Sequence, residues 1–145
     1  MTNLPKTCIY VCNTCRPEGF IGDDEDRPGA VFARALLREA QGRGLTEQIE
    51  LKAVNCLSVC KRPCTVAVSD AGKFTYVIGD LEPERDTAAV LEFVMKYREA
   101  GDGITKWRER PEVVRKGTVA RIPPVGHDAA PVTSIVTRPD SDETT

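Results

Sequence analysis

The chain has 145 residues, of which 41% are hydrophobic and 29% charged, with a formal net charge of −2. This composition is typical of one folded domain, and the charge gives no general attraction to nucleic acid or to an anionic membrane. No apolar run reaches the roughly 20 residues of a membrane span and the first residues lack an apolar export signal, so we expect a cytoplasmic protein without membrane or nucleic-acid partners.

The first half of the chain predicts a strand, a helix and a second strand. Residues 7–11 are rich in β-branched and aromatic side chains, as strands are. Residues 30–41 carry apolar side chains at helical spacing, and this helix cannot start before about Pro28. Its apolar stripe consists of Phe32, Leu36 and Leu37, with Ala33 and Ala40. Residues 49–54 alternate between apolar and polar side chains, which favours a strand.

The second half predicts a hairpin followed by a helix. Residues 65–68 and 74–78 read as strands on either side of the turn sequence Asp-Ala-Gly-Lys, and residues 83–100 form an amphipathic helix that ends before Gly101. The order is β-α-β-loop-β-β-α, which is the thioredoxin order with a cysteine-containing loop in place of one helix. We therefore expect an α/β fold in which two parallel pairings and an antiparallel hairpin give a four-stranded mixed sheet.

The composition changes after residue 103. We expect residues 1–104 to form the thioredoxin-like domain and residues 105–126 to form an extended basic appendage. This appendage would dock in part through Trp107, Val113 and Val114, and its arginines could bind an acidic partner or the acidic loop of the chain itself. Residues 127–145 are predicted to be a disordered tail, which includes the only histidine, His127.

Six cysteines in two groups carry most of the chemical information. The groups are Cys8, Cys12 and Cys15 near the start, and Cys56, Cys60 and Cys64 in the middle. In a reducing cytosol, clustered cysteines more often bind metals or catalyse reactions than form structural disulfides. Two short pairs, C-x-x-C and C-x-x-x-C, can place four sulfurs around one point, which suits zinc or an iron–sulfur cluster.

Two further interpretations of these cysteines stay open. A C-x-x-C motif after a strand is also the signature of a dithiol–disulfide oxidoreductase, but that chemistry needs a helix N-terminus at the motif, and the first helix starts well past Cys15. A four-cysteine site for zinc or cobalt is the other alternative, because spacing alone does not select the metal. A single histidine disfavours most His-dependent catalysis, so we do not expect an enzyme.

The segment from Asn55 to Val94 resembles the thioredoxin-like 2Fe-2S ferredoxins. It has their C-x-x-x-C loop at Cys56 and Cys60, and Pro63 stands where thioredoxin folds have a cis-proline. The sequence TCIYVC is similar to their first strand, with Cys12 at the position of the first ligand. Residues 7–124 also resemble small bacterial predicted metal-binding proteins that are often encoded beside cobalamin-biosynthesis and cobalt-chelatase genes.

The resemblance implies a 2Fe-2S cluster held by Cys12, Cys15, Cys56 and Cys60. Those ferredoxins place a second ligand about a dozen residues after the first, where this chain has no cysteine, so Cys15 would take that role. Cys64 is the substitute ligand, whereas Cys8 is expected inside the strand. The resemblance implies a one-electron carrier or an accessory protein that handles metal or clusters, with a link to cobalamin biosynthesis. It also implies a redox or metal-handling protein as partner, and a homodimer.

Overall fold

The structure, a computed structural model, describes residues 5–135. Its strands and helices in chain order are β1 (Thr7–Cys12), η1 (Asp24–Asp26), α1 (Pro28–Gly42), β2 (Ile49–Val54), β3 (Val66–Ser69), β4 (Thr75–Ile78), α2 (Thr87–Glu99), η2 (Trp107–Glu109), α3 (Glu112–Gly117) and β5 (Thr118–Ile122). None of the helices in this part of the chain is long and apolar enough to cross a membrane.

The sheet contains five strands in the order β2-β1-β3-β4-β5, whereas we expected four. Only the pairing of β1 with β2 is parallel, and the other three neighbouring pairs are antiparallel, so the expected second parallel pairing is wrong. The loop between β2 and β3 stays at one end of the sheet, because the C=O of Thr65 accepts from the N–H of Cys12 at the end of β1 (3.0 Å). Without a crossover back to the other end, β3 must run antiparallel to β1.

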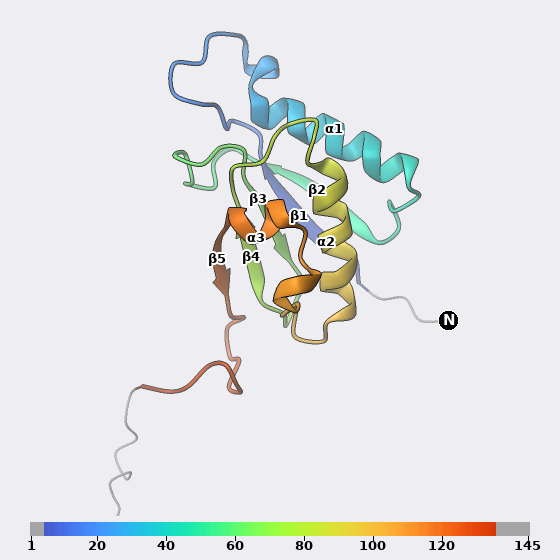
Figure 1. Ribbon diagram of the computed structural model, residues 1–145, viewed down its shortest axis with the longest axis vertical. Coiled ribbons are helices and arrows are strands. Elements are labelled where there is room, and N and C mark those ends of the chain that lie inside the picture. The colour runs from blue at the N-terminus through green and yellow to red at the C-terminus, as the bar shows by residue number, and fades with distance from the viewer. Residues whose placement is uncertain (1–4, 136–145) are drawn as a thin grey trace, which may run out of the picture.

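One face of the sheet carries the core. Alternate side chains of β1, Ile9 and Val11, are buried, while Cys8 and Tyr10, which alternate with them, are partly exposed. Figure 1 shows α2 lying across the sheet with α1 beside it. Phe93 of α2 packs edge-on against Tyr76 of β4, with ring centroids 4.9 Å apart. The apolar side chains of the helices and those of the strands therefore pack against each other on this one face of the sheet.

The helix α1 confirms most of the predicted apolar stripe. Phe32, Leu36 and Ala40 are fully buried, but Leu37 is 43% exposed. Consecutive residues in a helix differ by about 100° in direction, so Leu37 turns away from the core that Leu36 enters. Leu37 lies on the side of α1 that borders β2.

The segment 105–126 is not the extended appendage that we expected. It forms η2, α3 and β5, and β5 pairs with β4 as the fifth strand of the sheet. Val114 is fully buried, as expected for a docking residue, but Trp107 is 66% exposed and carries Arg115 over its ring at 4.8 Å. Burial of Val114 and strand pairing outweigh the basic, proline-containing composition of this segment.

Part of the predicted tail is ordered by contacts with the hairpin. The ring of His127 packs edge-on against Phe74, with centroids 5.1 Å apart, so His127 is not simply a solvated polar residue. The prediction of disorder for residues 136–145 lies outside the described residues.

Candidate metal centre

Strand β1 ends in the C-x-x-C motif, which folds as a tight turn. The N–H of Cys15 donates to the C=O of Cys12 (3.3 Å), and the N–H of Asn13 donates to the C=O of Val54 at the end of β2 (3.0 Å). Both thiols are largely covered, with Cys12 3% and Cys15 6% exposed. The ends of β1 and β2 therefore hold this cysteine pair at one end of the sheet.

The start of α1 packs directly against the same turn. The N–H of Gly29, in the first turn of α1, donates to the C=O of Cys15 (3.0 Å). A Cβ atom at Gly29 would lie 2.1 Å from the carbonyl oxygen of Cys12, so only glycine allows this approach. The helix does begin at Pro28, as predicted, but the intervening loop returns it to the motif. The expectation that no helix N-terminus lies at the C-x-x-C motif is therefore wrong, because residues distant in the sequence are close in the fold.

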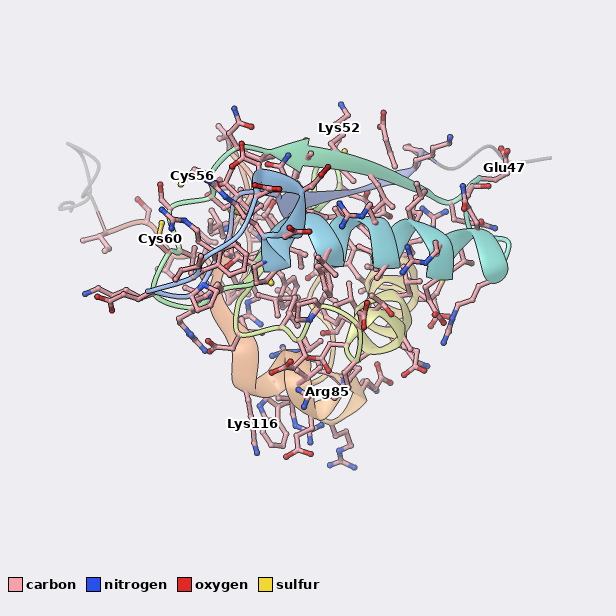
Figure 2. All side chains as sticks on the ribbon, turned by 90° about the horizontal axis from the view of Figure 1, so that it is seen from above. Glu47, Lys52, Cys56, Cys60, Arg85 and Lys116 are labelled. Carbon is pink, nitrogen blue, oxygen red and sulfur yellow. The ribbon has the colours of Figure 1, made fainter. Side chains whose placement is uncertain are left out.

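The second cysteine pair lies on the exposed loop between β2 and β3. Cys56 and Cys60 are exposed, and their thiols are within hydrogen-bonding reach of each other. The thiol of Cys56 accepts a hydrogen bond from the N–H of Ser58 (3.2 Å), which has a positive φ of 62°. Figure 2 shows Cys56 and Cys60 at one end of the molecule, far from Glu47 before the start of β2.

Cys60 of the second pair shares a hollow with the first pair. The backbone N–H of Leu57 donates to the thiol of Cys12, and the charge of Cys12 acts on Cys60. A pocket of about 340 Å³ opens beside them and is lined by Cys12, Thr14, Cys15, Arg16, Pro17, Glu18, Gly19 and Cys60. Of the four predicted ligands, Cys12, Cys15 and Cys60 therefore line one pocket, whereas Cys56 is not part of its lining.

Burial and hydrogen bonding separate the pKa values of these thiols. Burial acts to raise the pKa of Cys12, but hydrogen bonds from Cys15 and from the N–H of Leu57 outweigh it and leave this pKa below its usual value. Burial, followed by the hydrogen bond and negative charge of Cys12, raises the pKa of Cys15 to about 12. The hydrogen bond with Cys56 raises the pKa of Cys60. Within the motif, Cys12 is thus the thiol that ionises first.

Cys64 and Cys8 have different positions. Cys64 is 1% exposed, and burial, aided by the charge of Cys12, raises the pKa of its thiol to about 12. Its backbone is paired with Leu81, through N–H to C=O bonds of 3.3 and 3.1 Å. Cys8 lies four residues before Cys12 on β1, about 13 Å away at the strand rise, and its thiol is 3.8 Å from the carboxylate of Glu50. Cys64 therefore lies in the core within the electrostatic influence of Cys12, whereas Cys8 belongs to another part of the sheet.

The end of the cysteine loop departs from expectation in one respect. We expected a cis bond before Pro63, but the cis peptide follows it, between Pro63 and Cys64. The preceding Arg62 ties the loop to the rest of the fold: its Nε donates to the carboxylate of Asp80 (2.7 Å) and its Nη2 to the C=O of Lys116 (3.1 Å). The N–H of Asp80 in turn donates to the C=O of Arg62 (2.9 Å). Sequence reasoning missed this residue because its partners are distant in the chain.

The chemical type of these side chains suits a metal ion or cluster that is bound by thiolates. Four thiols, with N–H groups directed at Cys12 and Cys56, are the ligands that iron–sulfur clusters and zinc use. Between residues 5 and 135, however, no three Cys, His, Asp or Glu side chains are already gathered tightly enough to hold an ion. The thiols instead interact as two pairs, and the exposed loop of Cys56 and Cys60 is the part that must adjust to close a site.

Comparison with solved structures confirms the fold. The chain is similar to a thioredoxin-like 2Fe-2S ferredoxin from Aquifex aeolicus, with a TM-score of 0.56 and 20% identity over 86% of this chain and 100% of the ferredoxin. The wild-type structure of that ferredoxin at 1.5 Å matches with a TM-score of 0.52 and 22% identity over 81% and 99% of the two chains. A cysteine-to-serine variant matches with a TM-score of 0.53 and 19% identity over 79% and 98%. The fold is therefore thioredoxin-like.

Comparisons at the level of sequence identify the family. No curated protein matches the chain. The family model described as "Protein of unknown function (DUF1636)" matches residues 9–124, which include all the cysteines except Cys8 and every element from α1 to β5. The chain therefore belongs to the DUF1636 family.

Proposed function

We propose that the protein holds a 2Fe-2S cluster through Cys12, Cys15, Cys56 and Cys60, and that it acts as a one-electron carrier. The observation that carries this proposal is that Cys60 of the second pair lines the same pocket as Cys12 and Cys15, although the two pairs are 41 positions or more apart in the sequence. The thioredoxin-like ferredoxins share the fold. Two of their cysteine-to-serine variants concern cysteines separated by three residues, as Cys56 and Cys60 are.

The residues around the thiols have distinct roles in this proposal. When bound, the cluster would supply reversible one-electron transfer. The N–H groups of Leu57 and Ser58 direct partial positive charge at the sulfurs of Cys12 and Cys56, which stabilises thiolates and raises the potential of a bound centre. Exposure of Cys56 and Cys60 leaves the centre close to the surface, where a redox partner can approach.

The resemblance to proteins encoded beside cobalamin-biosynthesis genes supports a finer proposal, in which the centre serves metal or cluster handling in that pathway. Its partner would then be a metal-handling protein, and the protein would have no substrate of its own. Cobalt offered to the apoprotein in place of iron tests this version. Stoichiometric cobalt–thiolate absorption that depends on Cys12 supports it. Absence of cobalt binding to the apoprotein contradicts it.

The test of the main proposal is an anaerobic ultraviolet–visible spectrum of freshly purified protein, with iron, zinc and sulfide measured in the same sample. We expect visible absorption that bleaches with dithionite, and equal amounts of iron and acid-labile sulfide. Cys12→Ser is expected to abolish this absorption, whereas Cys8→Ser, in the same strand, should retain it. Colourless protein that contains one zinc ion would contradict the cluster and indicate a zinc site made of the same four cysteines.

A second candidate function, a dithiol oxidoreductase, is favoured by one observation. The N-terminus of α1 abuts the Cys12–Cys15 turn, and helix N-termini stabilise the thiolate that attacks a disulfide. In this reaction the Cys12 thiolate would form a mixed disulfide with the substrate, and Cys15 would displace the second substrate thiol and leave a Cys12–Cys15 disulfide. Metal-free protein that reduces a protein disulfide with dithiothreitol as reductant, and loses this activity in Cys12→Ser, supports it. Absence of activity in metal-free protein with both thiols reduced contradicts it.

A further inference from the structure

Two opposite charges border the pocket beside Cys60. Arg16 and Glu18 both line this pocket of about 340 Å³, and both are exposed. Neither side chain forms an ion pair or a hydrogen bond with another residue between 5 and 135. The pocket is open near Gly19, where a Cβ atom would meet nothing within 4 Å. A guanidinium donates from a planar fork and a carboxylate accepts at two oxygens, so both groups remain available to a ligand.

The acidic residues that follow in the same loop have other contacts. The carboxylate of Asp24 pairs with Arg27 (3.0 Å), and the C=O of Glu25 accepts a hydrogen bond from Arg34 of α1 (2.9 Å). These contacts tie the acidic run to the start of α1. The loop therefore leaves the guanidinium of Arg16 without a carboxylate partner of its own.

Arg16 acts on the thiol of Cys60. The hydrogen bond with Cys56 is the main cause that raises the pKa of Cys60, and the charge of Arg16 opposes this rise. The guanidinium therefore lies near this thiol. Lys61 follows Cys60 in the chain and is also exposed, but it is not part of the pocket lining. Arg16 is thus the cation that faces a ligand in this pocket.

Cys60 is the thiol of the pocket that a reactant can reach. Cys12 and Cys15 also line the pocket, but they are only 3% and 6% exposed, whereas Cys60 is an exposed residue. Cys56 is exposed too, but it lies outside the lining. A small molecule that binds in this pocket therefore meets Cys60 first.

We propose that the pocket binds disulfides of small amino-acid thiols and that Cys60 is a site of S-thiolation. The ligand carries a carboxylate beside an ammonium group, and these groups bind Arg16 and Glu18 respectively. The thiolate of Cys60 attacks the nearer sulfur of the ligand. A bond forms between these two sulfurs, the S–S bond of the ligand breaks, and the other half leaves as a thiolate. Cys60 is thereby oxidised, and the half that leaves is reduced.

Cys56 makes a second step possible, because its thiol is within hydrogen-bonding reach of Cys60. The thiolate of Cys56 attacks the sulfur of Cys60, the ligand leaves as its thiolate, and a disulfide between Cys56 and Cys60 remains. Both residues are ligands in the proposed function, so this oxidation prevents the metal centre from closing. The S-thiolation itself requires no metal, so it can fail or succeed separately from the proposed function.

The test measures S-thiolation of the full chain, freed of metal by a chelator, in a Cys56→Ser background where the mixed disulfide at Cys60 persists. Three disulfides are compared. Cystine carries both charged groups, dithiodipropionate carries only carboxylates, and cystamine carries only ammonium groups. Each rate is divided by the rate with neutral hydroxyethyl disulfide, which removes differences in the intrinsic reactivity of the thiol. Mass spectrometry measures the adduct, and peptide mapping locates it.

The charge of each ligand predicts which substitution affects it. We expect Arg16→Gln to lower the relative rate about twofold to fivefold for cystine and dithiodipropionate but not for cystamine. Glu18→Gln should lower the relative rate by a similar factor for cystine and cystamine but not for dithiodipropionate. Lys61→Gln is the matched control and should have a smaller effect than Arg16→Gln, because Lys61 is outside the lining.

A cystine rate that Arg16→Gln or Glu18→Gln leaves unchanged overturns the proposal. An effect of Lys61→Gln as large as that of Arg16→Gln also overturns it, because general attraction by positive charge then explains the reaction. A second measurement compares the two exposed thiols. In Cys60→Ser, the relative rate of cystine at Cys56 should be at least about threefold lower than at Cys60 in Cys56→Ser. Equal rates would show that the pocket selects neither the ligand nor the thiol.

Discussion

Gly29 stands where the first helix meets the C-x-x-C turn, and the spacing there excludes any larger residue. Its missing Cβ would lie 2.1 Å from the carbonyl oxygen of Cys12 and 2.9 Å from the backbone nitrogen of Cys15. Real Cβ atoms do not approach backbone atoms so closely, so a side chain would separate α1 from the turn. This one residue therefore decides how near the helix N-terminus comes to the thiols.

We expect Gly29→Ala to lower the free energy of unfolding by about 1–3 kcal/mol and to impair metal or cluster loading, because the displaced backbone carries Cys12 and Cys15. Gly42→Ala is the matched control at the other end of α1, where a Cβ meets nothing within 4 Å. It should stabilise the protein by about 0.5–1 kcal/mol. Urea unfolding and metal analysis measure both effects, and equal behaviour of the two variants would contradict the account of Gly29.

Tyr97 is a fully buried phenol whose hydroxyl joins α2 to the hairpin. It donates to the C=O of Phe74 (2.5 Å) and accepts from the N–H of Asp70 (3.0 Å). Burial raises its pKa well above the usual value of 10. The folded state therefore binds the phenolic proton more tightly than the unfolded state does, and this contribution to stability is complete below pH 10 and is lost as the pH rises further.

Tyr97→Phe is expected to cost about 1–3 kcal/mol at neutral pH, because it leaves the buried C=O of Phe74 and the N–H of Asp70 without their partner. The same substitution should reduce the loss of stability between pH 10 and pH 11, since the phenol is gone. Urea unfolding at pH 7, 10 and 11 measures both effects. Parallel pH dependence of the two proteins would show that other groups govern alkaline unfolding.

At the scale of elements, the cysteine loop is anchored at its two ends, and its cysteines between them are exposed. At its first end the loop continues directly from β2, which is paired with β1. At its second end Arg62 binds the carboxylate of Asp80 and the C=O of Lys116. Gly79 makes this tie possible, because a Cβ there would lie 2.8 Å from the carbonyl oxygen of Arg62. The segment between, with exposed Cys56 and Cys60, is therefore the adjustable part of the site.

Arg62→Gln is expected to speed hydrogen exchange in residues 59–65 by about threefold to tenfold, while it lowers global stability by at most about 1 kcal/mol, because the ion pair with Asp80 is partly exposed. Lys61→Gln is the control, since the neighbouring Lys61 is exposed. Mass spectrometry of exchanged peptides resolves the difference. If both variants exchange alike, the loop is held by its backbone alone.

At the scale of the whole molecule, the C-terminal segment completes the fold. Strand β5 closes the edge of the sheet beside β4, the C=O of Gly117 accepts from the N–H of Gly79 (2.7 Å), and Val114 is fully buried. The same segment supplies the Lys116 carbonyl that binds Arg62. The division of the chain at residue 104 stays a prediction, and truncation can test it.

A chain of residues 1–104 is expected to lose more than about 2 kcal/mol of stability relative to the full chain, because it exposes the contacts of Val114 and the edge of β4. A chain of residues 1–135 retains every described element and should unfold as the full chain does. Thermal and urea unfolding compare the three. Equal stability of the shortest chain would show that residues 1–104 are an independent domain.

The sequence by itself determined the types of the main elements up to residue 100, the thioredoxin-like order and the two cysteine pairs, because helical and strand periodicity and C-x-x-C spacing are local patterns. Only the tertiary structure decided the direction of β3, the fifth strand and the nearness of α1 to the C-x-x-C turn. Each of these depends on contacts between distant segments, such as Gly29 with Cys12 and Arg62 with Lys116, and local spacing carries no information about where a loop returns. For the same reason, the sequence selected the cysteines but not the residues that hold them in place.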